Sequence, residues 1–233
     1  MSEIKDTLDE QLGGSLSKTE EFYNKNKKAI QVGGAIVLLA VLGFIYMSYA
    51  NSEKEKEAQK SLFKIEYYFE LDSFNRILNG DPTDPDFINA VDFVDQYSGT
   101  PSAQKAAYIA GRAYMSIGDY STAIEYLEKF KLNDELVRAH ALGMIGDCYV
   151  DLGNVDKAEG YFKDAANYSK NLLTAPLYLK KLGLAQENLG KNEQAAKSYQ
   201  RIKKEFAESD QARDIEKYIA RANAKAGISS FDN

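Results

Sequence analysis

The chain has 233 residues and is acidic, with 29 Lys and Arg against 35 Asp and Glu and a net charge of −6. No part is basic enough to make nucleic acid the main partner, and a single cysteine, Cys148, excludes an internal disulfide. His140 and Cys148 alone do not form a usual zinc site, and no glycine-rich phosphate loop or nucleophile motif is present. We therefore predict a protein with no catalytic residue, no metal, no cofactor and no small-molecule substrate.

The first 28 residues are predicted to form a cytoplasmic tail. Residues 1–18 combine scattered charges with Gly13 and Gly14 and show little apolar periodicity, which is typical of a flexible segment. Residues 19–28 can extend the helix that follows.

Residues 29–50 are predicted to cross a membrane. No charged residue occurs from Ala29 to Ser52, and about 20 helical residues suffice to cross the hydrocarbon core. A cleaved signal peptide is the alternative, since Ser48 and Ala50 are small residues at a plausible cleavage site. The long, acid-containing region before the apolar run favours an uncleaved anchor.

The number of lysines near the span is the same on both sides, four before it and four after it, so the count alone does not decide the orientation. The run NKNKK lies directly before the span and favours an N-terminus on the inside, because lysines close to a span weigh most. The reversed topology, with the repeats on the cytosolic side, stays open. The competing lysines are Lys18, Lys25, Lys27 and Lys28 before the span, and Lys54, Lys56, Lys60 and Lys64 after it.

Residues 51–100 are predicted to hold a linker helix and a degenerate first helix pair. An apolar stripe from Leu62 to Leu78 indicates one helix that ends at Asn79 and Gly80. The segment 81–85 contains two prolines and predicts a turn. A partner helix is expected over 87–94.

Residues 101–208 contain three units with one pattern. Two glycines and an alanine recur in step, 35 residues apart from the first unit to the second and 37 from the second to the third. Such periodicity is the signature of stacked helix–turn–helix repeats, which form binding surfaces. The recurring residues are Gly111, Gly118 and Ala123, then Gly146, Gly153 and Ala158, then Gly183, Gly190 and Ala195.

Each unit is predicted to be two antiparallel helices. The first glycine and the alanine lie where the helices cross, and the second glycine ends the first helix, where a positive φ favours glycine. Thr100 with Pro101 is expected to start the first unit, and Thr174 with Pro176 the third. Residues 209–233 are predicted to form a capping helix from Asp210 to Ala226, ended by Gly227 and followed by a frayed tail.

This register resembles the tetratricopeptide repeat. That family's small residue, aromatic residue, turn glycine and alanine fall on Gly111, Tyr114, Gly118 and Ala123, and in the second unit on Gly146, Tyr149, Gly153 and Ala158. The third unit has Gln186 in place of the aromatic residue. The resemblance implies an all-α, tetratricopeptide-like solenoid, here preceded by a single transmembrane helix. Departures from the family pattern are Ala107, Leu142 and Leu179 for the opening tryptophan, and Glu135 and Lys170 for the closing proline.

In such repeats the first helices line a concave groove. The register predicts a groove of mixed charge with apolar patches as the place where a protein partner binds, and a binding site elsewhere on the surface stays open. The predicted partner-binding residues are Lys105, Tyr108, Arg112, Met115, His140, Asp147, Lys180, Leu184 and Glu187, with Gly143, Val150 and Leu177 between them.

The whole layout resembles the YfgM family, an ancillary subunit of the bacterial SecYEG translocon. An aromatic-plus-lysine run with Phe22, Tyr23, Asn26 and Lys28 precedes a glycine-containing span, and a polar helix leads into the repeats. The resemblance implies a single-pass inner-membrane protein with a cytoplasmic N-terminus and periplasmic repeats. It also implies partnership with SecYEG, with a periplasmic folding factor such as PpiD, and with exported polypeptides, which it assists as an adaptor or chaperone. The alternative is a scaffold of another envelope complex for export, outer-membrane assembly or division.

Overall fold

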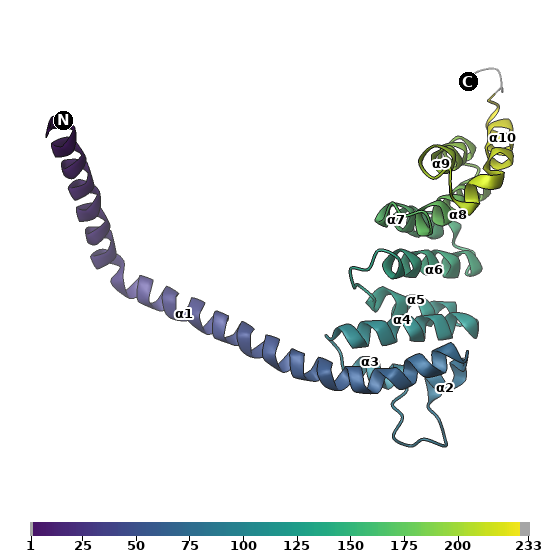
Figure 1. The fold of residues 1–233 in the computed structure, drawn as a ribbon, viewed down its shortest axis with the longest axis horizontal. Helices are drawn as coiled ribbons and strands as arrows, with labels where there is room; N and C mark the ends of the chain where they lie inside the picture. The colour runs from purple at the N-terminus through teal and green to yellow at the C-terminus, as the bar shows by residue number, and fades with distance from the viewer. Residues whose placement is uncertain (1, 229–233) are drawn as a thin grey trace. The chain divides into compact units, whose positions relative to one another are not determined.

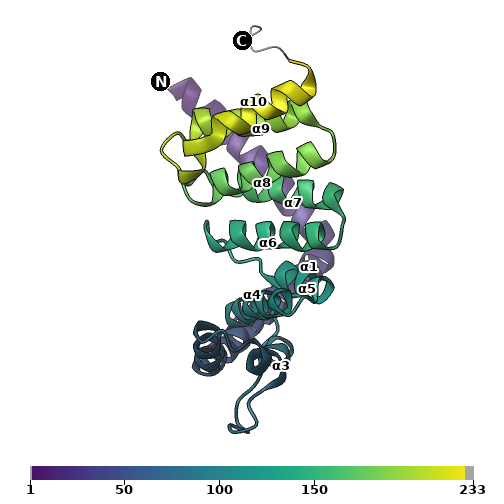
Figure 2. The same ribbon diagram turned by 90° about the vertical axis from the view of Figure 1, so that its right-hand side faces the viewer.

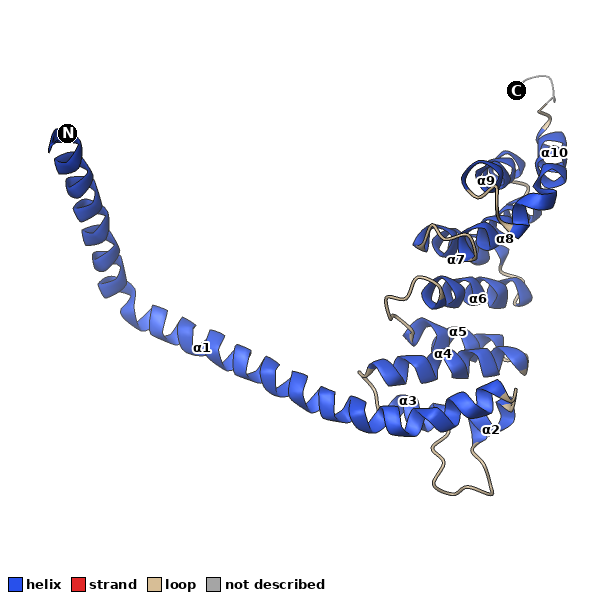
Figure 3. Cartoon of the chain, viewed as in Figure 1, coloured by secondary structure: helices blue, strands red, loops and turns tan. Residues whose placement is uncertain are grey.

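The computed structural model describes the backbone of residues 2–228 and the side chains of residues 23 and 25–228. The chain divides into two compact units, Met1–Glu53 and Lys54–Asn233. Within the described residues all regular structure is helical (Figure 3). The predicted all-α fold class is therefore confirmed.

Helix α1, Ser2–Glu70, runs through the boundary between the two units. Its backbone is already helical over residues 2–18, where the sequence predicted a flexible tail. The tail is rich in good helix formers such as Leu, Lys and Glu, and its glycine pair does not end the helix. From Lys25 onward α1 is long and apolar enough to cross a membrane, with a mean hydropathy of 2.2 in its most apolar window.

The linker helix ends earlier than predicted. We expected one helix up to Asn79, but α1 ends at Glu70, and Asp72 takes a φ of 50° before α2, Phe74–Asn79, begins. The break redirects the chain so that both Ile77 and Leu78 are buried with the side chains of α1 in one core. A turn follows, and α3 is Ala90–Gln96, displaced from the predicted range 87–94.

The three repeats are helix pairs stacked in chain order (Figures 1 and 2). Each helix packs against the next, and α10 closes the series on α9. The helices of the first pair are α4, Pro101–Ser116, and α5, Tyr120–Lys129. Those of the second are α6, Val137–Asp151, and α7, Val155–Tyr168. Those of the third are α8, Thr174–Asn188, and α9, Asn192–Glu205, followed by η1, Asp210–Asp214, and α10, Ile215–Ala226.

The repeat glycines have the two predicted roles. Gly118, Gly153 and Gly190 follow the first helix of each unit with φ values of 83°, 75° and 71°. At the helix crossings a large side chain from the second helix covers the glycine of the first, so any Cβ there would collide with it. The covering pairs are Leu127 over Gly111, Phe162 over Gly146 and Tyr199 over Gly183.

Helix ends follow the predictions in two cases and not in a third. The Thr100 side chain accepts a hydrogen bond from the Ala103 N–H at 3.1 Å, and Gly227 ends α10 with a φ of 74°. Thr174 does not cap α8. The Asn171 Oδ1 accepts instead from the N–H groups of residues 173 and 174, because an Asn side chain can mimic a turn of backbone. The predicted frayed tail, residues 229–233, lies outside the described residues.

Candidate functional site

The first helices of the repeats, α4, α6 and α8, carry all nine residues predicted to bind a partner. The Glu187 side chain is only 6% exposed, whereas Lys105 and Leu184 are the most open of the nine. The structure divides them into three regions, one at each end of the repeats and one in the middle.

In the middle region, Tyr178 of α8 lies against the backbone of Gly143 in α6. The Tyr178 hydroxyl is 2.6 Å from Nδ1 of His140. Burial raises the pKa of Tyr178, and burial, together with the charges of Arg112 and Lys181, lowers the pKa of His140. Both side chains are therefore neutral at pH 7. The Tyr178 ring covers Gly143, so Gly143 is not exposed in a groove.

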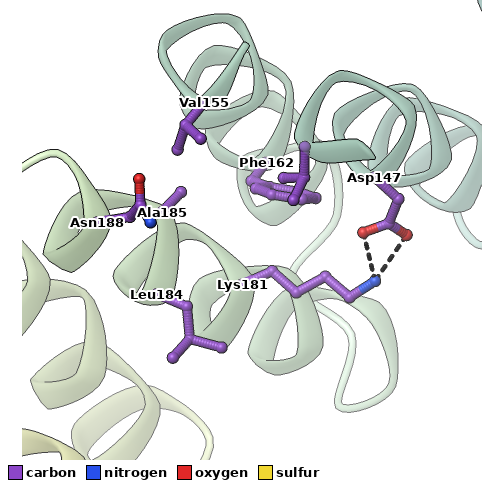
Figure 4. A pocket seen from close by; sticks show the side chains of 8 residues that line it. Asp147, Val155, Phe162, Lys181, Leu184, Ala185 and Asn188 are labelled. Atoms are coloured by element: carbon purple, nitrogen blue, oxygen red, sulfur yellow. Dashed lines mark hydrogen bonds and ion pairs between the residues drawn. The ribbon is translucent and has the colours of Figure 1, made fainter. Parts of the chain in front are cut away.

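Beside this tyrosine, Lys181 of α8 reaches Asp147 of α6. The Lys181 Nζ lies 2.7 and 2.6 Å from the two carboxylate oxygens. The pair borders a cleft of about 310 Å³ between α6, α7 and α8 (Figure 4). Its other walls are mostly apolar. They comprise Val150, Val155, Phe162, Leu184, Ala185 and Asn188.

This cleft has the size and chemistry to hold one apolar side chain of a polypeptide. Leu184 and Val150 at its mouth are each 44% exposed, so a partner can cover apolar surface there. The paired charges of Lys181 and Asp147 supply hydrogen-bonding groups at the edge. Pockets of this kind, apolar with a few polar groups, are the usual ligand sites of proteins.

At the N-terminal end of the repeats, Lys105 and Tyr108 line a second cleft. This cleft lies between α1, α4 and the loop that joins α5 to α6. Arg112 lies nearby with its guanidinium 5.8 Å from the centre of the Phe69 ring.

At the C-terminal end, the predicted residues already have partners within the chain. Lys180 Nζ lies 3.1 Å from Asp214. Glu187 receives hydrogen bonds from Arg221 at 2.6 Å, and from Lys225 and the Tyr199 hydroxyl. These contacts hold the capping helix α10 in place.

Glu187 is unusually acidic as a result. Burial alone raises the pKa of its carboxyl, but the hydrogen bonds from Arg221, Lys225 and Tyr199 outweigh burial and lower the pKa to about 2. Met115 is also engaged, since it packs against the core of the first two repeats. Glu187, Lys180 and Met115 thus contribute to the solenoid itself.

Sequence reasoning missed Tyr178 and Lys181, and the repeat register contains the signal for both. Tyr178 occupies the position of Ala106 and Ala141 in the other units, and Lys181 that of Ile109 and Met144. The third unit therefore differs from the other two. It has the large Tyr178 where they have alanine, and the charged Lys181 where they have an apolar residue.

The described residues offer little for other chemistry. Among them, no group of three or more His, Cys, Asp or Glu side chains could hold a metal ion. Cys148 is buried, and burial raises the pKa of its thiol to about 11. A thiol in that state is a poor nucleophile.

Comparison with known proteins agrees with the repeat register. Family models described as tetratricopeptide repeat match residues 110–171 and 181–209. A search of curated protein sequences finds no significant match.

Among solved structures, the chain is similar to a putative kinesin light chain from Podosopora anserina with nearly identical TPR-like repeats. That protein is 15% identical, the match covers 74% of this chain and 88% of the other, and the TM-score is 0.51. A MamA protein is 19% identical, with 76% and 93% covered and a TM-score of 0.47. The chain thus contains tetratricopeptide repeats, a fold that serves as a scaffold for protein–protein interaction.

Proposed function

We propose that this chain is a membrane-anchored tetratricopeptide adaptor or chaperone that associates with the SecYEG translocon and assists newly exported proteins. It sits in the bacterial inner membrane with a cytoplasmic N-terminus, and its repeats lie in the periplasm. Its partners are SecYEG, a periplasmic folding factor such as PpiD, and exported polypeptides. Residues 29–50 form the anchor, and residues 101–208 form the partner-binding repeats.

One observation carries the proposal: an apolar helix with no polar face precedes the repeats in one chain. Its side chains are exposed along the helix, with Leu39 at 66% and Phe44 at 75%. A helix that is apolar all round needs an apolar environment, and the hydrocarbon of a membrane is one.

The binding face supports an adaptor role. The exposed Leu184 and Val150 beside an apolar cleft leave surface for a polypeptide to cover. The resemblance to the YfgM family supplies the translocon as the partner, and the lysines of NKNKK before the span support the inward N-terminus.

A pull-down in mild detergent tests the partner. We expect SecYEG to co-purify with the full chain, and Leu184→Lys to reduce the recovery of polypeptide partners. Leu152→Lys is the matched control, because Leu152 is exposed to a similar extent, 47%, and lies in the turn after α6. Recovery of another envelope complex without SecYEG would contradict the proposal and favour the scaffold alternative.

A reporter fused to the C-terminus tests the orientation. A reporter that is active only outside the cytoplasm is expected to be active, and one that is active only in the cytoplasm to be silent. The opposite result would place the repeats in the cytosol and remove exported polypeptides as direct partners.

A further inference from the structure

We propose that the cleft between α1, α4 and the α5–α6 loop, called here the α1–α4 cleft, binds an extended polypeptide segment with an aromatic or branched apolar residue next to lysine or arginine. The inference rests on the proposed function only in taking the ligand to be a polypeptide. It adds the chemistry of the segment that is recognised.

The floor of the α1–α4 cleft is aromatic. The rings of Tyr108 and Phe130 are 5.4 Å apart, and Phe69 contributes a third ring from α1. The cleft measures about 510 Å³, against about 310 Å³ for the cleft beside Lys181. Aromatic rings favour edge or offset contacts with other rings, so a bulky apolar side chain fits this floor best.

The wall formed by the α5–α6 loop is held in place before any ligand binds. The Lys131 N–H donates to Gln104 of α4 at 2.8 Å, and Asp134 Oδ1 accepts from the N–H of Val137 at 2.7 Å. The guanidinium of Arg138 donates to the Phe130 carbonyl. A wall that is already ordered loses little conformational freedom on binding.

The rim of the α1–α4 cleft is acidic. Glu66, Glu70 and Asp134 line it, against Lys105 and the nearby Arg112, whose guanidinium lies 5.8 Å from the centre of the Phe69 ring, so acidic groups outnumber basic ones by three to two. Glu66 and Glu70 are exposed, and neither has an ion-pair partner within the described residues. The two lie four residues apart on one helix, where like charges repel. A bound lysine or arginine relieves this repulsion, which gives the cleft its preference for a basic residue.

The cleft beside Lys181 provides an internal contrast. There the charges of Lys181 and Asp147 neutralise each other at 2.6 Å, so that cleft offers no net charge to a ligand. Selection by charge therefore belongs to the α1–α4 cleft.

Fluorescence anisotropy with labelled peptides tests the inference on the purified full chain in detergent micelles. One probe carries a phenylalanine flanked by lysines, and the other carries glutamates in their place. We expect the lysine probe to bind more tightly and to lose affinity as salt is added. The double variant E66K/E70K is expected to weaken its binding about tenfold and to strengthen that of the glutamate probe.

The double variant E193K/E208K is the matched control. Both glutamates are exposed, the change in net charge is the same, and neither lines the α1–α4 cleft. We expect it to bind the lysine probe within about twofold of the unchanged chain, since distant exposed charges are largely screened. Circular dichroism verifies that each variant keeps its helical fold.

Equal binding of the two probes, or an unchanged affinity in E66K/E70K, would overturn the inference. Equal weakening in E193K/E208K would also overturn it, because the effect would then depend on net charge alone. Co-purification of SecYEG is measured separately on the same variants. If SecYEG does not co-purify with the unchanged chain, the proposed function is contradicted. The peptide-binding result, in contrast, tests only the chemistry of the α1–α4 cleft.

Discussion

Gly146 and Gly160 are both helical glycines, but their surroundings predict opposite effects of substitution. A Cβ at Gly146 would lie 2.6 Å from the Phe162 ring, whereas a Cβ at Gly160 meets nothing within 4 Å. Phe162 is only 2% exposed and has little room to move. We expect Gly146→Ala to destabilise the protein by ~1–3 kcal/mol, since overpacking a buried contact outweighs the better helix propensity of alanine.

Gly160→Ala is the control and is expected to stabilise by ~0.5–1 kcal/mol, because alanine favours the helix and restricts the unfolded chain. Urea unfolding followed by far-UV circular dichroism measures both changes. Similar unfolding free energies for the two variants would show that Phe162 can move aside, contrary to the tight crossing described above.

Glu187 holds α10 through two side chains of that helix, Arg221 and Lys225, so Glu187→Gln is expected to loosen it. Arg221 and Lys225 stay partly exposed, at 44% and 50% of their side chains. Water can therefore satisfy them, which limits the loss to ~1–2 kcal/mol. Hydrogen exchange detected by mass spectrometry should speed up in α10 and stay unchanged in α4. Uniform acceleration across the repeats would argue that Glu187 acts on global stability instead.

The lowered pKa of Glu187 also predicts that the stability of the protein decreases at acidic pH. The pKa of Glu187 is about 2 in the folded protein against an ordinary value of 4.5. A lowered pKa contributes stability that is complete above pH 4.5, declines as the pH falls, and is gone below pH 2. The advantage of the unchanged chain over Glu187→Gln in thermal unfolding should therefore shrink between pH 4.5 and pH 2. An advantage that stays constant over this range would contradict the assignment.

Two ionic contacts between helices join residues that are slightly less than one repeat length apart. Asp147 pairs with Lys181 and Glu187 with Arg221, each pair 34 residues apart. The first pair joins α6 to α8 and the second joins α8 to α10, so each contact bridges two helices that one further α-helix separates in the chain.

A double-mutant cycle on Asp147→Asn and Lys181→Gln measures one such contact. Their side chains are 26% and 34% exposed, so the coupling free energy is expected to be ~0.2–1 kcal/mol. Unfolding of the two single variants and the double variant in urea gives the value. Zero coupling would mean that the pair borders the cleft without linking the repeats.

The helix pairs were predictable from the sequence because glycine and alanine recur wherever backbones cross or reverse. The break at Asp72 was not, since the apolar stripe continues across it and only the tertiary core decides between a bend and a straight helix. Gln186 shows the same limit. It replaces an aromatic residue and is buried, accepting a hydrogen bond from the Ser198 hydroxyl at 2.8 Å. Periodicity cannot foresee such a polar substitution.

The candidate site was predictable in part for a related reason. Register alone placed the nine residues on the first helices, because each repeat presents equivalent positions. It could not show that Lys180 and Glu187 are engaged by the C-terminal segment, since that segment follows no repeat pattern. Nor could it show the α1–α4 cleft, which depends on the break after Glu70 and on the loop before α6.

The chain joins a helix that is long and apolar enough to cross a membrane to a helical solenoid with three apolar cores. The three apolar cores are composed of residues between Ala58 and Ala222. Residues 1–53 form a compact unit of their own. We therefore expect a chain beginning at Lys54 to be soluble without detergent and to keep its helical repeats.

Thermal unfolding of this shortened chain, followed by circular dichroism, should give a midpoint within a few degrees of that of the full chain in micelles, because a shift of that size corresponds to only ~1 kcal/mol.

The contacts of the first residues of the shortened chain explain why it should begin at Lys54. Lys54 donates to the Ser98 carbonyl at 3.0 Å, and Glu55 accepts from the Ser102 N–H at 3.0 Å, so both residues tie α1 to the start of α4. A chain beginning at Ala58 lacks these contacts and serves as the comparison. It should unfold at a lower temperature, and equal midpoints would show that residues 54–57 of α1 contribute nothing to the stability of the solenoid.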